Sequence, residues 1–261
     1  MENVAGSESS LKVALIQPLI SKSKPESLGY FAKVLESSDC ANLDVICLPE
    51  LWYTRVVINF EEEFSGILEL AKQKNSIIIP GAFLEKMDGN IFVSCPVISK
   101  NGNILGRQLK IHPFGLQKKR VKSGSRAEIF DFGAFKIGVV ICYDSVFPEV
   151  PRTLALKGAD ILFFPSKIRT EGIKPWNIYI QARALENRIP AVAANVCGGH
   201  FGGRSMIVNF DYNKKQDIAL PRVKVLSSQP QKYVATIDLE NSRQIRKRRF
   251  KNVKLDPYYL L

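Results

Sequence analysis

Three reactive side chains each follow an apolar, strand-like run, and together they contain the groups that nucleophilic catalysis needs. Glu50 ends the run VICLPE, Lys110 ends ILGRQLK, and Cys142 ends KIGVVIC. Binding and catalytic groups of α/β proteins gather at the carboxyl ends of strands. A cysteine supplies a nucleophile, a carboxylate takes its proton, and an ammonium stabilises the oxyanion that develops on the substrate. The three residues therefore predict a cysteine-dependent catalytic site.

Each of the three residues also has an ordinary structural interpretation. A glutamate or lysine at the end of a strand is usually solvated, and a free cysteine usually packs as a small hydrophobic residue. We apply that second interpretation to the remaining cysteines, Cys40, Cys47, Cys95 and Cys197. A Cys–His pair with His112 is the other arrangement to weigh. Because His112 lies two residues after Lys110 and precedes a proline, a structural role is favoured for it.

The cysteines and histidines also bear on compartment and metal binding. The five cysteines are odd in number, widely separated and without a C-x-x-C pair, which indicates a reducing compartment rather than a disulfide framework. The two histidines stand far apart, and no Cys/His spacing resembles a zinc site. We expect no metal.

Composition indicates a globular protein. The chain has 261 residues, of which 46% are hydrophobic and 24% charged. No apolar run reaches the roughly 20 residues that a membrane-spanning helix requires. The first ten residues, MENVAGSESS, carry two glutamates and no apolar core of a signal peptide. We therefore expect a cytoplasmic protein without a membrane partner.

The positive charge is concentrated in two segments. There are 37 Lys and Arg against 25 Asp and Glu, which gives a net charge of +12. The dense patches are 117–122 and 243–254, and neither has the interleaved aromatic residues of a base-stacking surface. A solvated or subunit-interface surface is therefore favoured over nucleic-acid binding.

The order of apolar runs predicts an α/β fold with layered sheets. We expect a flexible segment at 1–10 and a single domain over 11–261. The Asn101-Gly102 pair predicts a hairpin. Strands are predicted at 11–18, 43–50, 76–83, 91–99, 104–110, 135–144, 160–166, 190–196, 204–210 and 232–239, and helices at 25–38, 60–74, 148–158 and 174–187.

Several motifs in chain order give the sequence a family resemblance. The sequence resembles the nitrilase, or carbon–nitrogen hydrolase, superfamily, whose Glu–Lys–Cys triad matches the three residues above. The matching segments are PE at Glu50, LKIH around Lys110, CYDSVFPE from Cys142, W-x5-ARALEN from Trp176 to Asn187, Ala194-Asn195, GGRSMIV at 202–208 and DPYY at 256–259.

The resemblance implies both architecture and assembly. The expected fold is a four-layer αββα sandwich, and the expected assembly is a homodimer or a larger homo-oligomer. The basic C-terminal segment, 243–261, would then lie at a subunit interface.

The resemblance also implies a mechanism without a cofactor. Glu50 accepts the proton of Cys142, and the thiolate attacks a small linear amide, giving a thioester that water hydrolyses. Lys110 and the backbone N–H of Tyr143 hold the oxyanion. Carbamoyl-amide or nitrile hydrolysis by the same triad, or a catalytically weakened binding or scaffold protein, remain the alternatives.

Two departures from the family pattern concern the surroundings of the triad. Gln117 stands where many members carry a second glutamate near the lysine, and Val146 replaces a common arginine. Lys167, Arg169 or Arg204 could supply the missing cation. Trp52, Tyr53 and Thr54 directly follow Glu50 and are candidate pocket residues, although aromatic side chains there are about as often packing residues.

Overall fold

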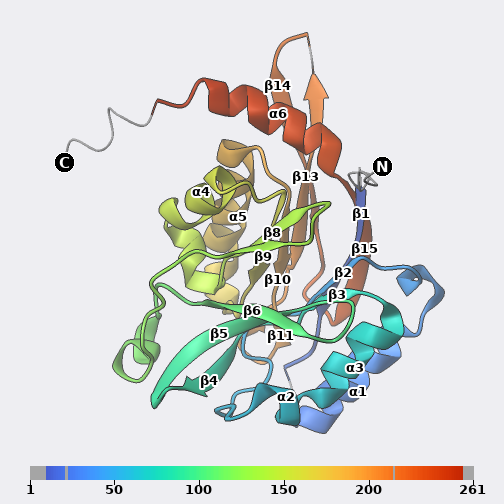
Figure 1. The fold of residues 1–261 in the computed structure, drawn as a ribbon, viewed down its shortest axis with the longest axis vertical. Coiled ribbons are helices and arrows are strands. Elements are labelled where there is room, and N and C mark those ends of the chain that lie inside the picture. Colours follow the sequence, from blue (N-terminus) through green and yellow to red (C-terminus); the bar gives the residue numbers. More distant parts are fainter. Residues whose placement is uncertain (1–9, 21–22, 214, 255–261) are drawn as a thin grey trace, which may run out of the picture.

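The computed structural model describes residues 10–20, 23–213 and 215–254. Two β-sheets pack face to face, and helices cover the outer face of each (Figure 1). Nearly all of the predicted segment 1–10 and the DPYY motif at 256–259 lie outside the described residues. The αββα sandwich expected from the sequence is confirmed.

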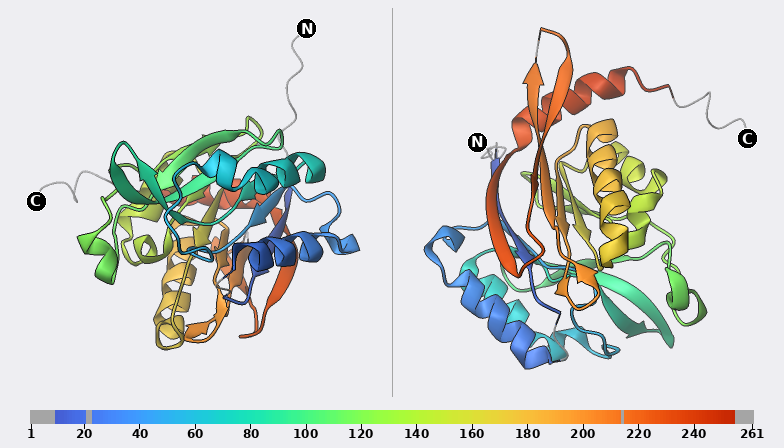
Figure 2. Two further views of the ribbon diagram at one scale, coloured as in Figure 1. Left: turned by 90° about the horizontal axis from the view of Figure 1, so that it is seen from below. Right: turned by 180° about the vertical axis from the view of Figure 1, so that it is seen from behind.

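The first sheet has seven strands. Five of them follow the order β15-β1-β2-β3-β5, with β4 and β6 on either side of the long β5. Seen from behind in Figure 2, β15 runs beside β1 at the edge of this sheet, where the two pair antiparallel along eight residues. The strands are β1 (Ser10–Gln17), β2 (Val45–Cys47), β3 (Ile77–Ile79), β4 (Phe83–Met87), β5 (Asn90–Ile98), β6 (Ile104–Leu109) and β15 (Gln231–Asp238).

The second sheet has six strands in the order β14-β13-β10-β9-β8-β7. Its central strands are parallel and wholly buried, as near-continuous apolar runs predict. The strands are β7 (Ile129–Asp131), β8 (Lys136–Val139), β9 (Ile161–Pro165), β10 (Ala191–Ala194), β13 (Met206–Asn213) and β14 (Ile218–Val225), and a short hairpin is formed by β11 (Cys197–Gly198) and β12 (Phe201–Gly202).

Apolar side chains of the two inner faces form one core between the sheets, and a further core lies under each helical layer. The helices α1 (Lys24–Leu35) and α3 (Ser65–Lys74) cover the seven-stranded sheet, and α4 (Glu149–Leu156) and α5 (Ile173–Asn187) cover the other. Helix α6 (Leu239–Lys251) crosses the top of the molecule in Figure 1.

The structure corrects the predicted strand at 76–83, which is divided into β3 and β4. Gly81 lies between them with a φ of +92°, and a Cβ there would stand 1.9 Å from the carbonyl oxygen of Pro49. Only glycine combines that backbone angle with such a close approach. Strand β4 then turns into β5 through Asp88-Gly89, a hairpin that the sequence analysis did not predict.

The structure also differs from the prediction at one helix and at two strands. The predicted helix 60–74 is broken at Phe64 into α2 (Phe60–Glu63) and α3, and strands β7 and β14 were not predicted. Strand β14 reads IALPRVKV and exposes most of its residues, so it lacks a buried apolar run. Its Pro221 is tolerated because β14 is an edge strand.

Part of the C-terminal basic segment binds within its own chain. Arg243 and Arg246 of α6 both pair with the buried carboxylate of Asp160 at 2.9 Å. Burial alone would raise the pKa of Asp160, but the hydrogen bonds from Arg243, from the N–H of Lys136 and from Arg246 leave it below its ordinary value. These two arginines anchor α6 to the six-stranded sheet.

Within the described ranges, no helix combines the length and the apolar composition that crossing a bilayer demands.

Candidate active site

The three residues singled out by the sequence meet in the structure. Glu50 follows β2, Lys110 follows β6 directly, and Cys142 follows β8, so two come from the seven-stranded sheet and one from the six-stranded sheet. Their exposed fractions are 2%, 1% and 8%. The backbone N–H of Glu50 donates to the carbonyl of Ser166, which follows β9 in the opposite sheet (3.2 Å).

Glu50 and Lys110 form a buried ion pair. The ammonium Nζ of Lys110 lies 2.7 Å from Oε1 of Glu50. Burial would lower the pKa of Lys110, but the charges of Glu50, Cys142 and Asp144 and the hydrogen bond to Glu50 together leave the pKa above its ordinary value. The lysine is therefore held as a cation beside the carboxylate.

Cys142 begins a short 3-10 turn, Cys142–Val146, with a φ of +48°. A positive φ is uncommon for a residue other than glycine and often marks functional sites. Burial, followed by the charge of Glu50, raises the pKa of Cys142 to about 12, while Lys110 and the backbone N–H of Lys167 act in the opposite direction. At neutral pH the sulfur is a thiol, hydrogen-bonded to Glu50.

Gln117 lies beside the lysine, at the position where the resemblance placed it. Its Oε1 accepts hydrogen bonds from Nζ of Lys110 (3.1 Å) and from the backbone N–H of Phe114 (3.0 Å). The second bond closes the short turn Gly115–Lys119. Gln117 thus connects the lysine to the segment that follows it.

Asp144 is a further residue of the site, which the sequence analysis quoted within CYDSVFPE without giving it a role. Its carboxylate accepts the backbone N–H groups of Ile111 (3.2 Å) and His112 (2.7 Å) and contacts Nδ1 of His112 (2.9 Å). The His112 ring stacks on Phe147 at 3.7 Å. Asp144 thereby joins the segment after Lys110 to the turn of Cys142, and His112 takes part in that connection.

Arg183 of the ARALEN motif holds the cysteine turn from the other side. Its Nε donates to the carbonyl of Ser145 (3.0 Å) and its Nη2 to that of Val146 (2.9 Å). Glu186 binds the remaining terminal nitrogen of the same guanidinium at 3.1 Å. The aromatic partner in the motif, Trp176, is buried in the core beneath the helices.

Tyr143 directly follows the nucleophile candidate, and its half-buried ring lies against Phe114 (4.7 Å) and Phe147 (5.3 Å). These rings cover the outer side of the cysteine turn. The backbone N–H of Tyr143 belongs to the same turn as Cys142.

Lys167 is the one alternative cation that the structure brings to the triad. Its Nζ donates to the carbonyl of Leu51 (2.9 Å), next to Glu50, and lies 4.9 Å from the ring of Phe201. Burial lowers the pKa of Lys167, and the charges of Glu50 and Cys142 oppose that shift. Arg169 and Arg204 are exposed.

Of the three candidate pocket residues after Glu50, two have side chains that pack in or against an aromatic core and one is exposed. Trp52 is 2% exposed within the aromatic core under α1 and α3, and its indole N–H donates to the carbonyl of Pro80 (2.7 Å). The ring of Tyr53 packs edge-on against Phe64 at 5.4 Å, and Thr54 is exposed. Trp52 and Tyr53 therefore serve packing, the alternative that the sequence left open.

No cluster of three or more His, Cys, Asp and Glu side chains suited to a metal ion occurs in the described part of the chain. The titratable groups gathered at the strand ends are the carboxylate, ammonium and thiol described above.

Comparison with known proteins defines the class. The family model described as carbon-nitrogen hydrolase matches residues 12–247. The chain therefore belongs to the carbon–nitrogen hydrolase family, and it is an enzyme of that hydrolase class.

Individual relatives agree with the family assignment. A probable nitrilase of Schizosaccharomyces pombe is 32% identical over 233 residues, covering 84% of each chain. A 2-oxoglutaramate amidase of Bacillus subtilis is 27% identical over 212 residues, covering 76% of this chain and 82% of that protein. The crystal structure of a carbon-nitrogen hydrolase from Helicobacter pylori superposes with a TM-score of 0.81 at 22% identity, covering 96% and 97% of the two chains, which supports the fold.

Proposed function

We propose that the protein hydrolyses a small linear amide to a carboxylic acid and ammonia or an amine, through a thioester on Cys142. The observation that carries the proposal is the burial of a carboxylate, an ammonium and a thiol together at facing strand ends. Membership of the carbon–nitrogen hydrolase family supports it.

The first half of the proposed reaction forms the thioester. Because the thiol of Cys142 stays protonated at neutral pH, Glu50 takes its proton as sulfur attacks the amide carbon. The oxyanion accepts hydrogen bonds from Lys110 and from the backbone N–H of Tyr143. Glu50 then returns the proton to the departing nitrogen.

The second half of the reaction releases the acid. Water enters, Glu50 takes one of its protons, and the hydroxide equivalent attacks the thioester carbon. The C–S bond breaks, and the proton held by Glu50 passes to the sulfur. Lys110 stays protonated throughout because Glu50 and Gln117 both accept from it.

A screen of linear amides for ammonia release tests the proposal, with nitriles and carbamoyl amides as parallel substrates. Labelling with a thiol reagent, followed by mass spectrometry, should locate the reactive cysteine at Cys142. Turnover of nitriles or carbamoyl compounds alone would favour the alternative reactions. A protein that is labelled at Cys142 but turns over no substrate would favour a binding or scaffold protein.

The position of Lys167 favours an amide that also carries a carboxylate. Glu50 and Lys110 are paired with each other, whereas the half-buried Lys167 ammonium lies next to Glu50 and Cys142 and donates to a neutral group, the carbonyl of Leu51. A partly buried cation gains most from an anionic ligand. The Bacillus subtilis relative is named for 2-oxoglutaramate, an amide of this kind.

Replacing Lys167 by glutamine should lower kcat/KM on a carboxylate-bearing amide by about tenfold or more, since charge-assisted hydrogen bonds contribute about 1.5–3 kcal/mol. The same substitution should change kcat/KM on the uncharged analogue much less, because the triad is untouched. The ratio of the two values is the measurement. Arg169→Gln removes an equal charge two residues away on the exposed surface and serves as control. Equal losses on both substrates would contradict the carboxylate assignment.

Replacing Gln117 by glutamate should raise turnover on simple amides and extend activity to higher pH. A carboxylate in this place keeps both hydrogen bonds of Gln117 and adds a negative charge 3.1 Å from the Lys110 ammonium. An opposite charge raises the pKa of a lysine, so the cation persists to higher pH. Paired pH–rate curves on one amide test this. Identical curves would show that the charge at this position does not influence Lys110.

We also propose that the single domain 11–261 forms a homodimer through α4 and α5. The outer surface of these helices exposes three aliphatic side chains, Leu156, Ile178 and Leu185. Light scattering should therefore give at least twice the chain mass of 29.3 kDa. Ile178→Lys should shift the protein toward monomer, while Ile58→Lys, a similarly exposed isoleucine on a distant loop, should not. A wild-type monomer at all concentrations would refute the pairing.

A further inference from the structure

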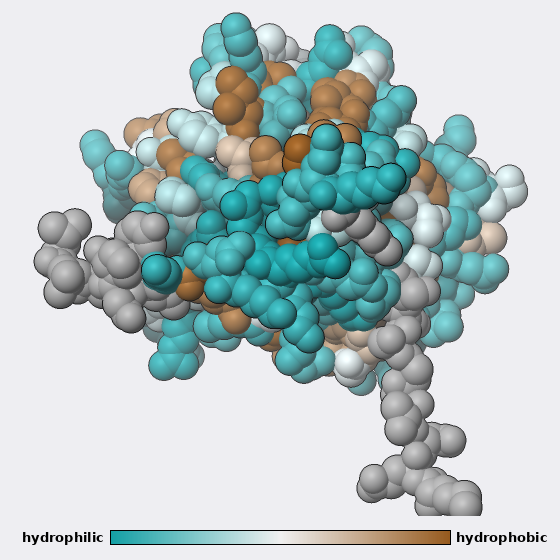
Figure 3. All heavy atoms as spheres, turned by 90° about the horizontal axis from the view of Figure 1, so that it is seen from above, coloured by the Kyte–Doolittle hydropathy of each residue, from teal (hydrophilic) through white to brown (hydrophobic). Residues whose placement is uncertain are grey.

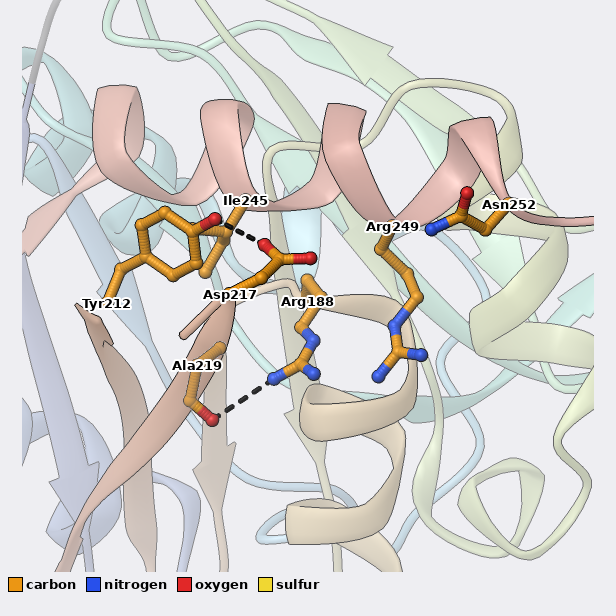
Figure 4. Close-up of a pocket in the computed structure, with 7 residues that line it drawn as sticks. All are labelled: Arg188, Tyr212, Asp217, Ala219, Ile245, Arg249 and Asn252. Carbon is orange, nitrogen blue, oxygen red and sulfur yellow. Dashed lines mark hydrogen bonds between the residues drawn. The ribbon is translucent and has the colours of Figure 1, made fainter. Parts of the chain in front are cut away.

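A small hollow lies between the C-terminal end of α5, the β13–β14 hairpin and α6 (Figure 4). Its volume is about 80 Å³. Two arginines, Arg188 at the end of α5 and Arg249 on α6, extend side by side into it. Neither residue takes part in the proposed hydrolysis.

The hydrogen-bond donors in the hollow exceed the acceptors. One nitrogen of Arg188 donates to the carbonyl of Ala219 (3.1 Å), and no partner among the described residues binds its other nitrogens. The guanidinium of Arg249 has no hydrogen bond or ion pair with any residue that the structure describes. Asn252 also turns its amide nitrogen toward Arg249 (Figure 4).

One carboxylate, that of Asp217, lines the same hollow, and it accepts the hydroxyl of Tyr212. A third arginine, Arg248, donates to that hydroxyl as well (2.8 Å). The lining thus carries one negative charge against the two of Arg188 and Arg249. An excess of positive charge remains.

The backbone at Arg188 has a conformation that is uncommon for a residue with a side chain. Arg188 ends α5 with φ 52° and ψ 47°, the left-handed conformation that glycine adopts most readily at this position of a helix. A residue with a side chain costs about 1 kcal/mol more there. The arginine keeps its guanidinium in the hollow in spite of that cost.

The charge of the hollow defines the ligand class, because two guanidinium groups lie together at a small cavity. Paired guanidinium forks match the oxygens of a phosphate group. We propose that Arg188 and Arg249 bind a phosphate group, free or esterified, in this hollow.

The surroundings favour the approach of such an anion. The face on which α6 lies is covered mainly by hydrophilic residues (Figure 3). On that helix Lys247, Arg248 and Lys251 are exposed. A positive surface of this kind raises the local concentration of anions around the hollow.

Calorimetric titration with inorganic phosphate, at constant ionic strength and with the full chain, tests the proposal. We expect one phosphate per chain and about tenfold weaker binding in Arg249→Gln, since a charge-assisted bond is lost. Lys247→Gln removes the same charge from the same helix but outside the hollow, and should bind as the wild type does. Asp217→Asn removes the opposing charge and should bind more tightly.

Arg188→Gly separates binding from folding. Glycine accepts a positive φ freely, so this variant should unfold at or near the wild-type temperature in phosphate-free buffer and yet lose about tenfold in affinity. Competition by glycerol phosphate identifies the source of the phosphate group. If glycerol phosphate displaces inorganic phosphate, the site accepts phosphate esters. If it does not, the free ion is the ligand.

Three results would overturn the site. Absence of phosphate binding by the wild type at millimolar concentration would do so directly. Equal loss in Lys247→Gln and Arg249→Gln would show diffuse attraction by a charged surface. Binding of an oligonucleotide without binding of inorganic phosphate would assign this face to a polyanion.

Discussion

Cys142→Ala is expected to reduce amide hydrolysis below detection while the protein remains folded. The substitution removes the sulfur that attacks the substrate in the proposed mechanism, and it leaves the positive φ of the turn and the contacts of Arg183 unchanged. Because a small side chain is merely shortened, the free energy of unfolding should change by about 1 kcal/mol or less. The measurements are kcat/KM on the best amide of the screen and thermal unfolding.

Two further variants serve as controls for Cys142→Ala. Cys40→Ala makes the same chemical change at a buried cysteine outside the site and should retain activity. Cys142→Ser should be almost inactive, because a carboxylate deprotonates a hydroxyl far less readily than a thiol. Turnover by purified Cys142→Ala would eliminate the thioester mechanism.

Lys110→Met is expected to abolish hydrolysis and also to destabilise the fold by about 3–5 kcal/mol. The substitution leaves the carboxylate of Glu50 without its charged partner. Glu50 is 2% exposed, and its Oε1 lies 2.7 Å from the Nζ of Lys110 in the wild type. An unpaired buried charge carries a penalty of that size. The double variant Lys110→Met with Glu50→Gln should recover most of the stability, because the unpaired buried charge is removed. It should recover none of the activity, because the proposed base is removed with it.

Denaturant unfolding of the wild type, Lys110→Met, Glu50→Gln and the double variant measures the coupling free energy between Lys110 and Glu50 directly. Lys136→Met offers a matched control, because Lys136 pairs with Asp131 at 2.9 Å on the exposed surface. That loss should cost less than about 1 kcal/mol. A Lys110→Met protein as stable as the wild type would mean that Glu50 is not held as an anion.

The sequence was sufficient to predict the layers and the proximity of Glu50, Lys110 and Cys142, because both depend on local patterns. Buried apolar runs predicted most strands, and their ends carried Glu50, Lys110 and Cys142. The family resemblance added the sandwich and the place of Gln117, and that side chain does contact the lysine.

The remaining features depend on contacts between segments far apart in the chain. Nothing local distinguishes Lys167 from the exposed Arg169, and only the packing of β9 against the turn at Leu51 brings the lysine to the site. Trp52 sits two residues from Glu50, but the chain turns between them at Leu51, which has a φ of +47°, and the ring of Trp52 lies in the core under α1 and α3. The role of Asp144 became clear only when the segment after Lys110 was seen to lie against it.

In the proposed mechanism, the division of Glu50, Lys110 and Cys142 between the two sheets makes hydrolysis depend on how the sheets are aligned. Glu50 and Lys110 move with one sheet, whereas Cys142 and Lys167 move with the other. A slide of one sheet over the other would move the proposed base, Glu50, away from the proposed nucleophile, Cys142, without breaking the pairing of strands within either sheet. Side chains packed between the sheets, such as Ile79 and Val139, therefore set the distance between the residues that each sheet contributes to the proposed active site.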